Sequence, residues 1–501
     1  MANINYLSKV AENIKPIHWC ITIFLSVLFY NFLNNEILPL EYVKIFDEKN
    51  YIDIVKNFSS HLTQQDFTPY YNSRIIIPAI VHYIISIMNF DSNISTIRNV
   101  FLGFNLFSIV LSLYYFYKIV KFKKYKDSTI MLGFCFLFVN FFILKFSNYY
   151  PVLLDVFGFT SGIIIFYYYI VNKKIAFFVS LFLSLFIFPT TIFVLISLIA
   201  STLVVFSEKG LNIEKNLIKY RVFLFAAIVF TILSFVYIFI FQNYNFKSTQ
   251  FELHLVPLTI VLLFTLIFHI LKPLLLLFDK ITFNTRFHYS ALFFIPVLLL
   301  LLFNLISKNL SIHYNGPEVL SPLNFIFNLF YQSLSFPLKF LISHFIYYGL
   351  FVIIFLLFHK HFFTHIKQSN SFNKIITVVF ILLSMGTETR QFIQLFPFFV
   401  FIFLDSIDKY KFNMKFLIAI FVFQLIWSRF WYSINTSEGF LANAFPGPNF
   451  MGFPAQSYFQ FHGPWLSTSN SIFYGCIFVF IYLIVLVLLK RMYKRGMLTH
   501  I

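Results

Sequence analysis

Apolar runs long enough to cross a lipid bilayer recur along this 501-residue chain, with mostly short polar segments between them. A membrane-spanning helix needs about 20 apolar residues, although shorter ones are tolerated inside a bundle. Only 11% of the residues are charged, whereas a soluble domain carries about 25%. We therefore predict an all-α fold in which residues 1–501 form one polytopic membrane domain of about fourteen spans. The expected spans cover residues 17–34, 100–117, 129–147, 156–171, 175–188, 189–206, 222–242, 255–271, 289–306, 338–358, 375–387, 391–404, 416–435 and 472–489.

The distribution of lysine and arginine predicts which way the chain crosses the membrane, because cytoplasmic loops are enriched in these residues. If residues 75–90 lie along the outer surface instead of spanning, 26 of the 37 Lys and Arg residues fall inside and 11 fall outside. This arrangement predicts a multi-pass protein of the cytoplasmic (inner) membrane with both termini in the cytoplasm. It also explains the net charge of +18 without a nucleic-acid partner.

Three long segments are then expected on the outer face, over residues 35–99, 307–337 and 435–470. The cytoplasmic loops are short and rich in lysine, and they contain no glycine-rich phosphate-binding loop. Membrane lipids would surround the helices. We therefore expect any chemistry to lie on the outer face.

The first external segment contains a pattern typical of an amphipathic helix at a membrane interface. At helical spacing, Asp47 is followed on one side by Tyr51, Ile54, Val55 and Phe58. Asp47 is therefore the acid that faces the membrane domain, which suggests a functional carboxylate. The structural alternative is that it only begins the helix near its positive dipole end.

The residues around this helix divide by the environment we expect for them. Glu48 would sit at the edge of the apolar face, and Asp53 would point to water. Arg74 stands where the polar part of the segment meets the apolar residues 75–90. A guanidinium can pair with phosphate oxygens through two parallel hydrogen bonds, whereas an arginine that only snorkels to the interface is the alternative.

Two further places carry ionisable residues at the expected outer surface. Asp155 follows a turn at Pro151 that leads back into the membrane, where a charged group is costly and commonly functional. Lys145 is a possible structural partner for it. Glu388 and Arg390 lie at a turn before another apolar run, and they could simply pair with each other. One topology nevertheless places all these acids and arginines on one face.

Together these motifs resemble the GT-C superfamily of integral-membrane glycosyltransferases. The interfacial helices of the family's first loop match residues 45–60 and 75–90, and the resemblance covers about the first 200 residues and residues 386–397. The family's His-Pro-Pro and Trp-Trp-Asp signatures are missing, which leaves the subfamily and the acceptor open. The matching motifs are Phe-Asp…Tyr (Asp47, Tyr51), Tyr-x-x-Arg…Pro (Tyr71, Arg74, Pro78), Asp155 at the second outer turn, and Glu-x-Arg (Glu388, Arg390) before a span that carries Pro397.

The resemblance implies an inverting hexosyl- or pentosyltransferase that moves a sugar from a polyprenyl-phosphate donor to a glycan, lipid or protein acceptor. It implies Asp47 as the general base, with Asp155 and Glu388 orienting the base, the acceptor or a divalent cation such as Mg²⁺ or Mn²⁺. Two other classes stay open, namely a polysaccharide polymerase or ligase of the O-antigen type and a membrane transporter. The substrate-binding residues that the resemblance implies are Tyr51, Tyr71, Arg74 and Arg390.

Overall fold

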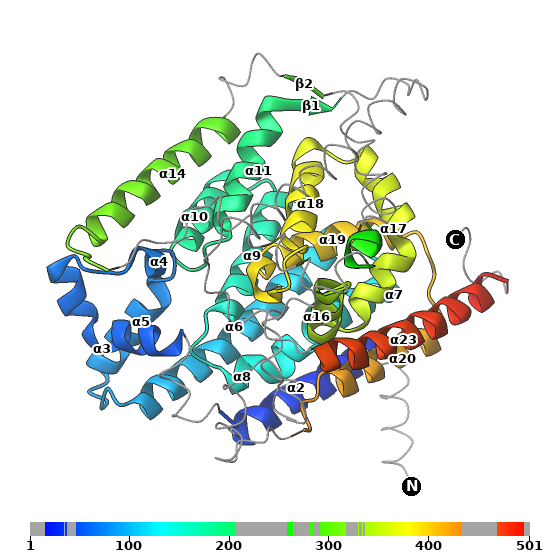
Figure 1. Cartoon of the computed structure of the whole chain (residues 1–501), viewed down its shortest axis with the longest axis horizontal. Helices are drawn as coiled ribbons and strands as arrows, with labels where there is room; N and C mark the ends of the chain where they lie inside the picture. Colours follow the sequence, from blue (N-terminus) through cyan, green and yellow to red (C-terminus); the bar gives the residue numbers. More distant parts are fainter. Residues whose placement is uncertain are drawn as a thin grey trace, which may run out of the picture.

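The computed structural model describes residues 16–34, 36–37, 47–206, 258–263, 266, 281–283, 291–316, 329, 333, 336–432 and 468–494. This part of the chain is a helical bundle (Figure 1), and the β structure within it is an antiparallel ribbon of β1 (Val204–Phe206) and β2 (Ile281–Phe283). The helices, in chain order, are α2 (Pro16–Asn34), α3 (Glu48–Gln64), α4 (Pro69–Asn72), α5 (Ile76–Ile87), α6 (Ile94–Lys123), α7 (Asp127–Phe138), η2 (Phe142–Phe146), α8 (Ser147–Tyr149), α9 (Asp155–Ile170), α10 (Lys174–Leu185), α11 (Thr191–Leu203), α14 (Ala291–Leu310), α16 (Lys339–Tyr348), α17 (Leu350–Gln368), α18 (Ser371–Leu383), η5 (Thr389–Phe392), α19 (Phe396–Ile407), α20 (Met414–Trp427) and α23 (Thr468–Lys494).

Five of the described helices are long and apolar enough to cross a membrane: α2, α6, α14, α17 and the Ser471–Tyr493 part of α23. A sixth results if α7 and the bent segment after it count as one span. Other apolar helices, such as α9 with 16 residues and α19 with 12, are shorter than the roughly 20 residues that a span needs. The chain is thus a polytopic helical membrane protein. The number of fourteen spans stays a prediction, and its expected span over residues 222–242 lies outside the described residues.

Gly349 divides the segment that was expected to be one span over residues 338–358, so this part of the prediction is wrong. Its backbone has φ +62° and ψ −134°, a conformation that favours glycine. Gln424 of α20 fills the break, because its side chain accepts a hydrogen bond from Leu350 N (2.9 Å) and donates one to the Tyr348 carbonyl (3.1 Å). A Cβ on Gly349 would lie 1.9 Å from Gln424 Oε1.

A second break bends the span expected over residues 129–147 by 46° between α7 and the segment that begins with η2. Asn140 stabilises this break, since its side chain donates to the Phe136 carbonyl (3.0 Å) and accepts from Ile143 N (3.0 Å). These bonds replace ones that an interrupted helix loses. The chain then passes through α8 and a short turn into α9, which begins at Asp155.

The first predicted external segment forms α3, α4 and α5 at one edge of the molecule (Figure 1). The predicted amphipathic helix is confirmed as α3: Tyr51, Ile54, Val55 and Phe58 are buried, and the polar residues between them are exposed. α3 packs on α5, whose His82 bonds through Nδ1 to the Val55 carbonyl at 2.6 Å. Of the other two expected external segments, residues 317–328, 330–332, 334–335 and 435–467 lie outside the described residues.

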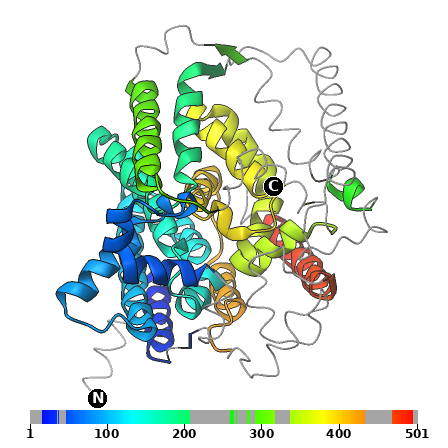
Figure 2. The ribbon, with the colours of Figure 1, turned by 60° about the vertical axis from the view of Figure 1, so that its left-hand side comes forward.

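The C-terminal end of α14 attaches to the chain around α4. Asn72 donates to the Ser307 carbonyl at 2.9 Å, and Phe67 N donates to the Leu310 carbonyl at 3.1 Å. Farther along, α14 packs on α11, which also contacts α18 (Figure 2). The short helix α4, which carries Tyr71, is thereby held against the bundle.

Helix α19 is at the buried centre of the bundle, where it packs against α7, α9, α17 and α18. Aromatic stacking is prominent, with ring centroids 4.0 Å apart for Phe380 and Phe399 and 4.9 Å apart for Phe166 and Phe401. Because η5 comes just before α19 in the chain, this packing also fixes the turn that precedes α19. That turn carries Arg390.

Candidate functional site

Arg390 joins three distant segments of the chain through its guanidinium. Its Nε donates to Asp155 Oδ1 at 3.1 Å, and its Nη2 lies 3.8 Å from Asp47 Oδ2. The exposed fraction of the side chain is 12% for Arg390, 1% for Asp155 and 34% for Asp47. Asp47, Asp155 and Arg390 therefore share one partly buried site, together with Arg74 and Glu388. We call these five residues the loop-one cluster.

Both acids that contact Arg390 lie at helix N-termini. Asp47 directly precedes α3, and its carbonyl accepts hydrogen bonds from Asn50 N (3.0 Å) and Tyr51 N (3.2 Å). Asp155 is the first residue of α9. The positive end of a helix dipole is a favourable place for a carboxylate. For Asp155, burial raises the pKa and the charge of Arg390 opposes this shift.

Two tyrosines line the cluster beside Asp47. The Tyr71 hydroxyl donates to Asp47 Oδ1 at 3.3 Å and accepts from Asn50 Nδ2 at 2.6 Å. The Tyr51 ring is buried against the Tyr71 ring, with centroids 5.3 Å apart. Burial and the nearby Asp47 carboxylate raise the pKa of Tyr71, so this phenol is a neutral hydrogen-bond donor at ordinary pH.

Arg74 is a buried cation, 9% exposed, at the edge of the same cluster. It donates to the Tyr70 carbonyl (2.9 Å) and the Tyr70 hydroxyl (3.3 Å), and its guanidinium lies 4.1 Å from the centre of that ring. Among the described residues, no carboxylate lies within 4.0 Å of this guanidinium. The groups that act on it electrostatically are Tyr51, Tyr70, Asp47 and Arg390.

Glu388 lies on the turn between α18 and η5, where Gln391 Nε2 donates to its Oε2 at 2.8 Å. Burial raises the pKa of Glu388, while the charge of Arg390 opposes this shift and that of Asp47 adds to it. Glu388 is thus within electrostatic reach of both residues. The structure brings all five charged residues of the predicted site together, along with Tyr51 and Tyr71.

The contacts of Asp155 contradict the structural alternative that Lys145 is its partner. Lys145 forms an ion pair with Glu36, whereas Asp155 is bound by Arg390. The second oxygen of Asp155, Oδ2, is buried and has no hydrogen-bond partner in the part of the chain that the structure describes.

The sequence prediction missed a buried ion pair directly beside Asp47. Glu48 is 0% exposed, and its two carboxylate oxygens accept from Arg98 Nε (2.6 Å) and Nη2 (3.0 Å). Glu48 was expected at the edge of the apolar face, and this prediction is wrong. The ion pair with Arg98 on α6 holds Glu48 fully inside the protein. Arg98, a charged residue in the first two turns of a long, mostly apolar helix, is the signal that could have indicated a buried acid partner.

The described residues contain no group of three or more His, Cys, Asp or Glu side chains placed to hold a metal ion. Between Asp47 and Asp155 lies the guanidinium of Arg390, a cation that contacts both carboxylates. These residues do not form a site for Mg²⁺ or Mn²⁺ in this arrangement.

Comparison with known proteins returned no matching family model, no similar curated protein and no similar solved structure. The functional argument therefore rests on the chain's own residues and contacts.

Proposed function

We propose that the protein is an inverting glycosyltransferase similar to the GT-C superfamily, which transfers a sugar from a polyprenyl-phosphate donor to a hydroxyl of a glycan, lipid or protein acceptor. In this proposal the loop-one cluster faces the outer side of the cytoplasmic membrane, and both termini are cytoplasmic. The motifs that resemble the superfamily lie on segments that contact one another, which supports the proposal.

The observation that carries the proposal is Arg74. Burying a charge is costly unless it is paired, yet none of the described carboxylates lies within ion-pair distance of this buried guanidinium. An anionic ligand would provide the missing partner, and arginine suits a phosphate because of its planar set of donors. Arg390 supplies a second cation nearby, so a donor phosphate could be held between the two.

Asp47 is the carboxylate best suited to act as general base. Its side chain is 34% exposed, whereas that of Asp155 is 1% exposed, and a base must reach its substrate. Asp47 would take the proton from the acceptor hydroxyl as that oxygen attacks the anomeric carbon. The bond from the anomeric carbon to the phosphate oxygen then breaks, and polyprenyl phosphate leaves with the electron pair. Asp155 would orient Arg390, and Glu388 would adjust the charge of the site.

The test uses the full chain in lipid nanodiscs, with a panel of polyprenyl-phosphate hexoses and pentoses. We expect one donor to release polyprenyl phosphate and to yield a glycoside of inverted anomeric configuration. If preassembled glycan is transferred from a polyprenyl diphosphate, the protein is a polymerase or ligase. If a sugar crosses sealed vesicles with no bond broken, it is a transporter. Either result overturns the proposal.

A further inference from the structure

A second incompletely paired cation, Arg429, lies just beyond the C-terminal end of α20. Its guanidinium makes no hydrogen bond or ion pair within the part of the chain that the structure describes, and its Nη1 atom is buried. Arg74, by comparison, donates to two oxygens of Tyr70. Burying part of a cation without a partner is costly, so an anionic ligand would stabilise this arrangement.

The backbone of Arg429 adopts the left-handed conformation, with φ +55°. Glycine or asparagine usually occupies this position after a helix, because a larger side chain is strained there. Hydrogen bonds hold the conformation on both sides, since Arg429 N donates to the Ile426 carbonyl (3.1 Å) and Tyr432 N donates to the Arg429 carbonyl (3.1 Å). An arginine at a place where glycine would be less strained indicates a role for its side chain.

Two aromatic rings hold the guanidinium of Arg429. Its Cζ lies 5.3 Å from the centre of the Trp427 ring and 5.0 Å from that of the Tyr474 ring on α23. Trp427 is itself fixed, because its Nε1 donates to the Phe345 carbonyl on α16 at 3.0 Å. The rings attract the charge of the guanidinium, but neither accepts a hydrogen bond from it. The donors of Arg429 are therefore left for a ligand.

Ser471 provides a second polar group on the same side of the site. It lies one helical turn before Tyr474 on α23, so the two side chains are neighbours on that helix, and it is 1% exposed. Its hydroxyl has no hydrogen-bond partner among the residues that the structure describes. Because buried polar groups are nearly always paired, an oxygen-rich ligand would complete both Ser471 and Arg429.

The surroundings of this site belong to the boundary between lipid and water. Ser471 begins the part of α23 that is long and apolar enough to cross a membrane, so lipid head groups lie near its height. Ile426, Ile472 and Phe473 are each more than half exposed, and in a membrane they would contact lipid tails. A ligand with an anionic head and apolar tails therefore matches both the charge and the neighbouring surface.

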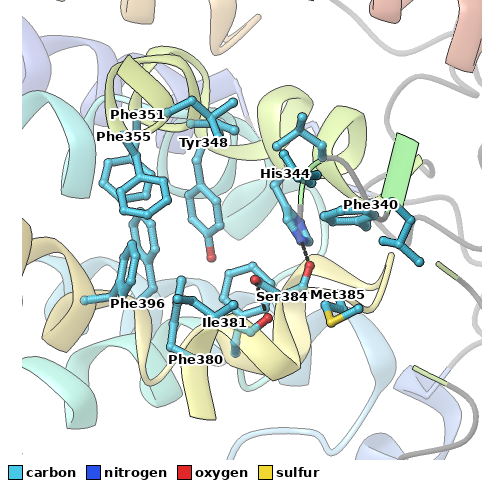
Figure 3. A pocket seen from close by; sticks show the side chains of 17 residues that line it. Phe340, His344, Tyr348, Phe351, Phe355, Phe380, Ile381, Ser384, Met385 and Phe396 are labelled. Carbon is cyan, nitrogen blue, oxygen red and sulfur yellow. Dashed lines mark hydrogen bonds between the residues drawn. The ribbon is translucent and has the colours of Figure 1, made fainter. Parts of the chain in front are cut away.

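This site and the loop-one cluster are connected to α16 through different residues. A carbonyl can only accept, so His344 on α16 donates through Nε2 to the Ser384 carbonyl at 2.7 Å (Figure 3). Its Nδ1 then accepts from the hydroxyl of Thr389 (3.0 Å), which directly precedes Arg390. The carbonyl of the next residue, Phe345, accepts instead from Trp427. The two groups of residues are thus separate sites.

We infer that Arg429 and Ser471 bind the phosphate of an anionic phospholipid whose tails lie along α20 and α23. The planar donors of a guanidinium match two oxygens of a phosphate. A head group with net negative charge suits the site, because residues 409–501 contain one acidic side chain, Glu438. This inference goes beyond the proposed function and does not depend on it.

The test measures binding of phosphatidylglycerol to the full chain in a neutral detergent, by native mass spectrometry at increasing lipid concentration. The matched control for Arg429→Gln is Lys415→Gln, which removes one exposed charge from the opposite end of α20. We expect Arg429→Gln to raise Kd about tenfold and Lys415→Gln to leave it unchanged. Ser471→Ala should raise Kd about threefold. Phosphatidylcholine, whose head group has no net charge, should bind to the wild type about tenfold more weakly.

Four results would overturn the inference: unchanged Kd in Arg429→Gln, an equal loss in Lys415→Gln, equal affinity for the two lipids, or displacement of the lipid by inorganic phosphate. The last result would assign the site to a soluble anion. If Arg429→Gln does not fold, Ser471→Ala decides, and unchanged Kd in that variant has the same meaning.

Glu438→Gln tests whether the chain itself completes Arg429. We expect this variant to leave Kd unchanged, whereas tighter lipid binding would show that Glu438 competes for the guanidinium and would also overturn the inference. None of these assays involves sugar transfer. Failure of the lipid site therefore leaves the proposed function intact, and absence of transfer from every donor leaves the lipid site intact.

Discussion

The loop-one cluster and the contacts at the C-terminal end of α6 use similar residues in different ways. At the end of α6, Lys123 binds Asp405 Oδ2 at 2.8 Å and the Tyr125 hydroxyl donates to Asp405 Oδ1 at 2.6 Å. We call these contacts the α6–α19 clamp. Lys126 N donates to Asp408 Oδ1 at 3.0 Å. Both oxygens of Asp405 have partners, so the clamp is complete without a ligand.

Asp155 and Arg74 of the loop-one cluster are more deeply buried than Lys123 and Asp405 of the clamp, and they are less completely paired. Asp155 Oδ2 has no hydrogen-bond partner, and Arg74 no carboxylate partner, among the described residues. Unpaired buried groups are costly, so a fold keeps them where something else completes them. The difference teaches that charge at the end of a helix bundle is evidence for a ligand only when the protein leaves that charge incomplete.

The largest effect is expected where the cluster is accessible. A positioned base contributes about 10²–10⁴-fold, so Asp47→Asn should reduce sugar transfer by roughly that factor without lowering the amount of protein in the membrane. Asp405→Asn removes an acid of the clamp and should leave transfer per folded molecule nearly unchanged. The two variants are compared in the donor-release assay. Equal losses in both would mean that the cluster acts through stability alone, as the clamp does.

The buried pair beside Asp47 should behave as a structural contact despite its place in the cluster's neighbourhood. Glu48→Gln leaves Arg98 as an uncompensated buried charge, which costs about 3–5 kcal/mol of unfolding free energy. Thermal unfolding should show this loss, whereas Lys49→Gln, on the exposed side of α3, should show almost none. A stable Glu48→Gln protein that has lost transfer would place Glu48 in the chemistry instead.

Binding of polyprenyl phosphate should depend on Arg74 of the loop-one cluster and not on the α6–α19 clamp. Losing a hydrogen bond to a charged group costs about 1.5–3 kcal/mol, so Arg74→Gln should raise Kd for polyprenyl phosphate about 10- to 150-fold. Lys123→Gln removes a cation from the α6–α19 clamp and should not change this Kd. Titration of nanodisc-embedded protein with the sugar-free lipid measures both. Equal affinity in wild type and Arg74→Gln would remove Arg74 from the site.

The smallest effect concerns Glu388 and pH. Because burial raises the pKa of Glu388, the folded protein keeps this proton to a higher pH than the unfolded chain does. The free energy of unfolding therefore falls as pH rises through that range, and Glu388→Gln cannot lose stability in this way. The Tm of the variant minus that of the wild type should be more positive at pH 8 than at pH 5. The opposite trend would show that Glu388 is held as an anion.

Sequence patterns predicted local features of the site well. The helical period placed Tyr51, Val55 and Phe58 on the buried face of α3 and Asp53 on the exposed face, because burial of one face is a local property of spacing. The predicted site residues also lie together. Their exact contacts were not predictable, since Arg390 could have paired with Glu388 beside it instead of Asp155 on another helix.

Features set by contacts between distant segments escaped the sequence analysis. The ion pair of Glu48 with Arg98 joins residues on different helices. The sequence around either residue does not specify its partner. The break at Gly349 was hidden inside an apolar run, because the side chain that fills it is Gln424 on α20. Helix lengths likewise depend on such breaks, so several described helices inside predicted spans, α9 and α19 among them, are shorter than a span needs.

The break at Gly349 also has a consequence for the site. The helix that ends there, α16, carries His344, and His344 holds the turn before Arg390. The angle between α16 and α17 is set by the side-chain amide of Gln424 on α20. This amide bonds to the backbone on both sides of Gly349. The position of Arg390 therefore depends on α20, which contributes no residue to the cluster, and on Gly349, which has no side chain.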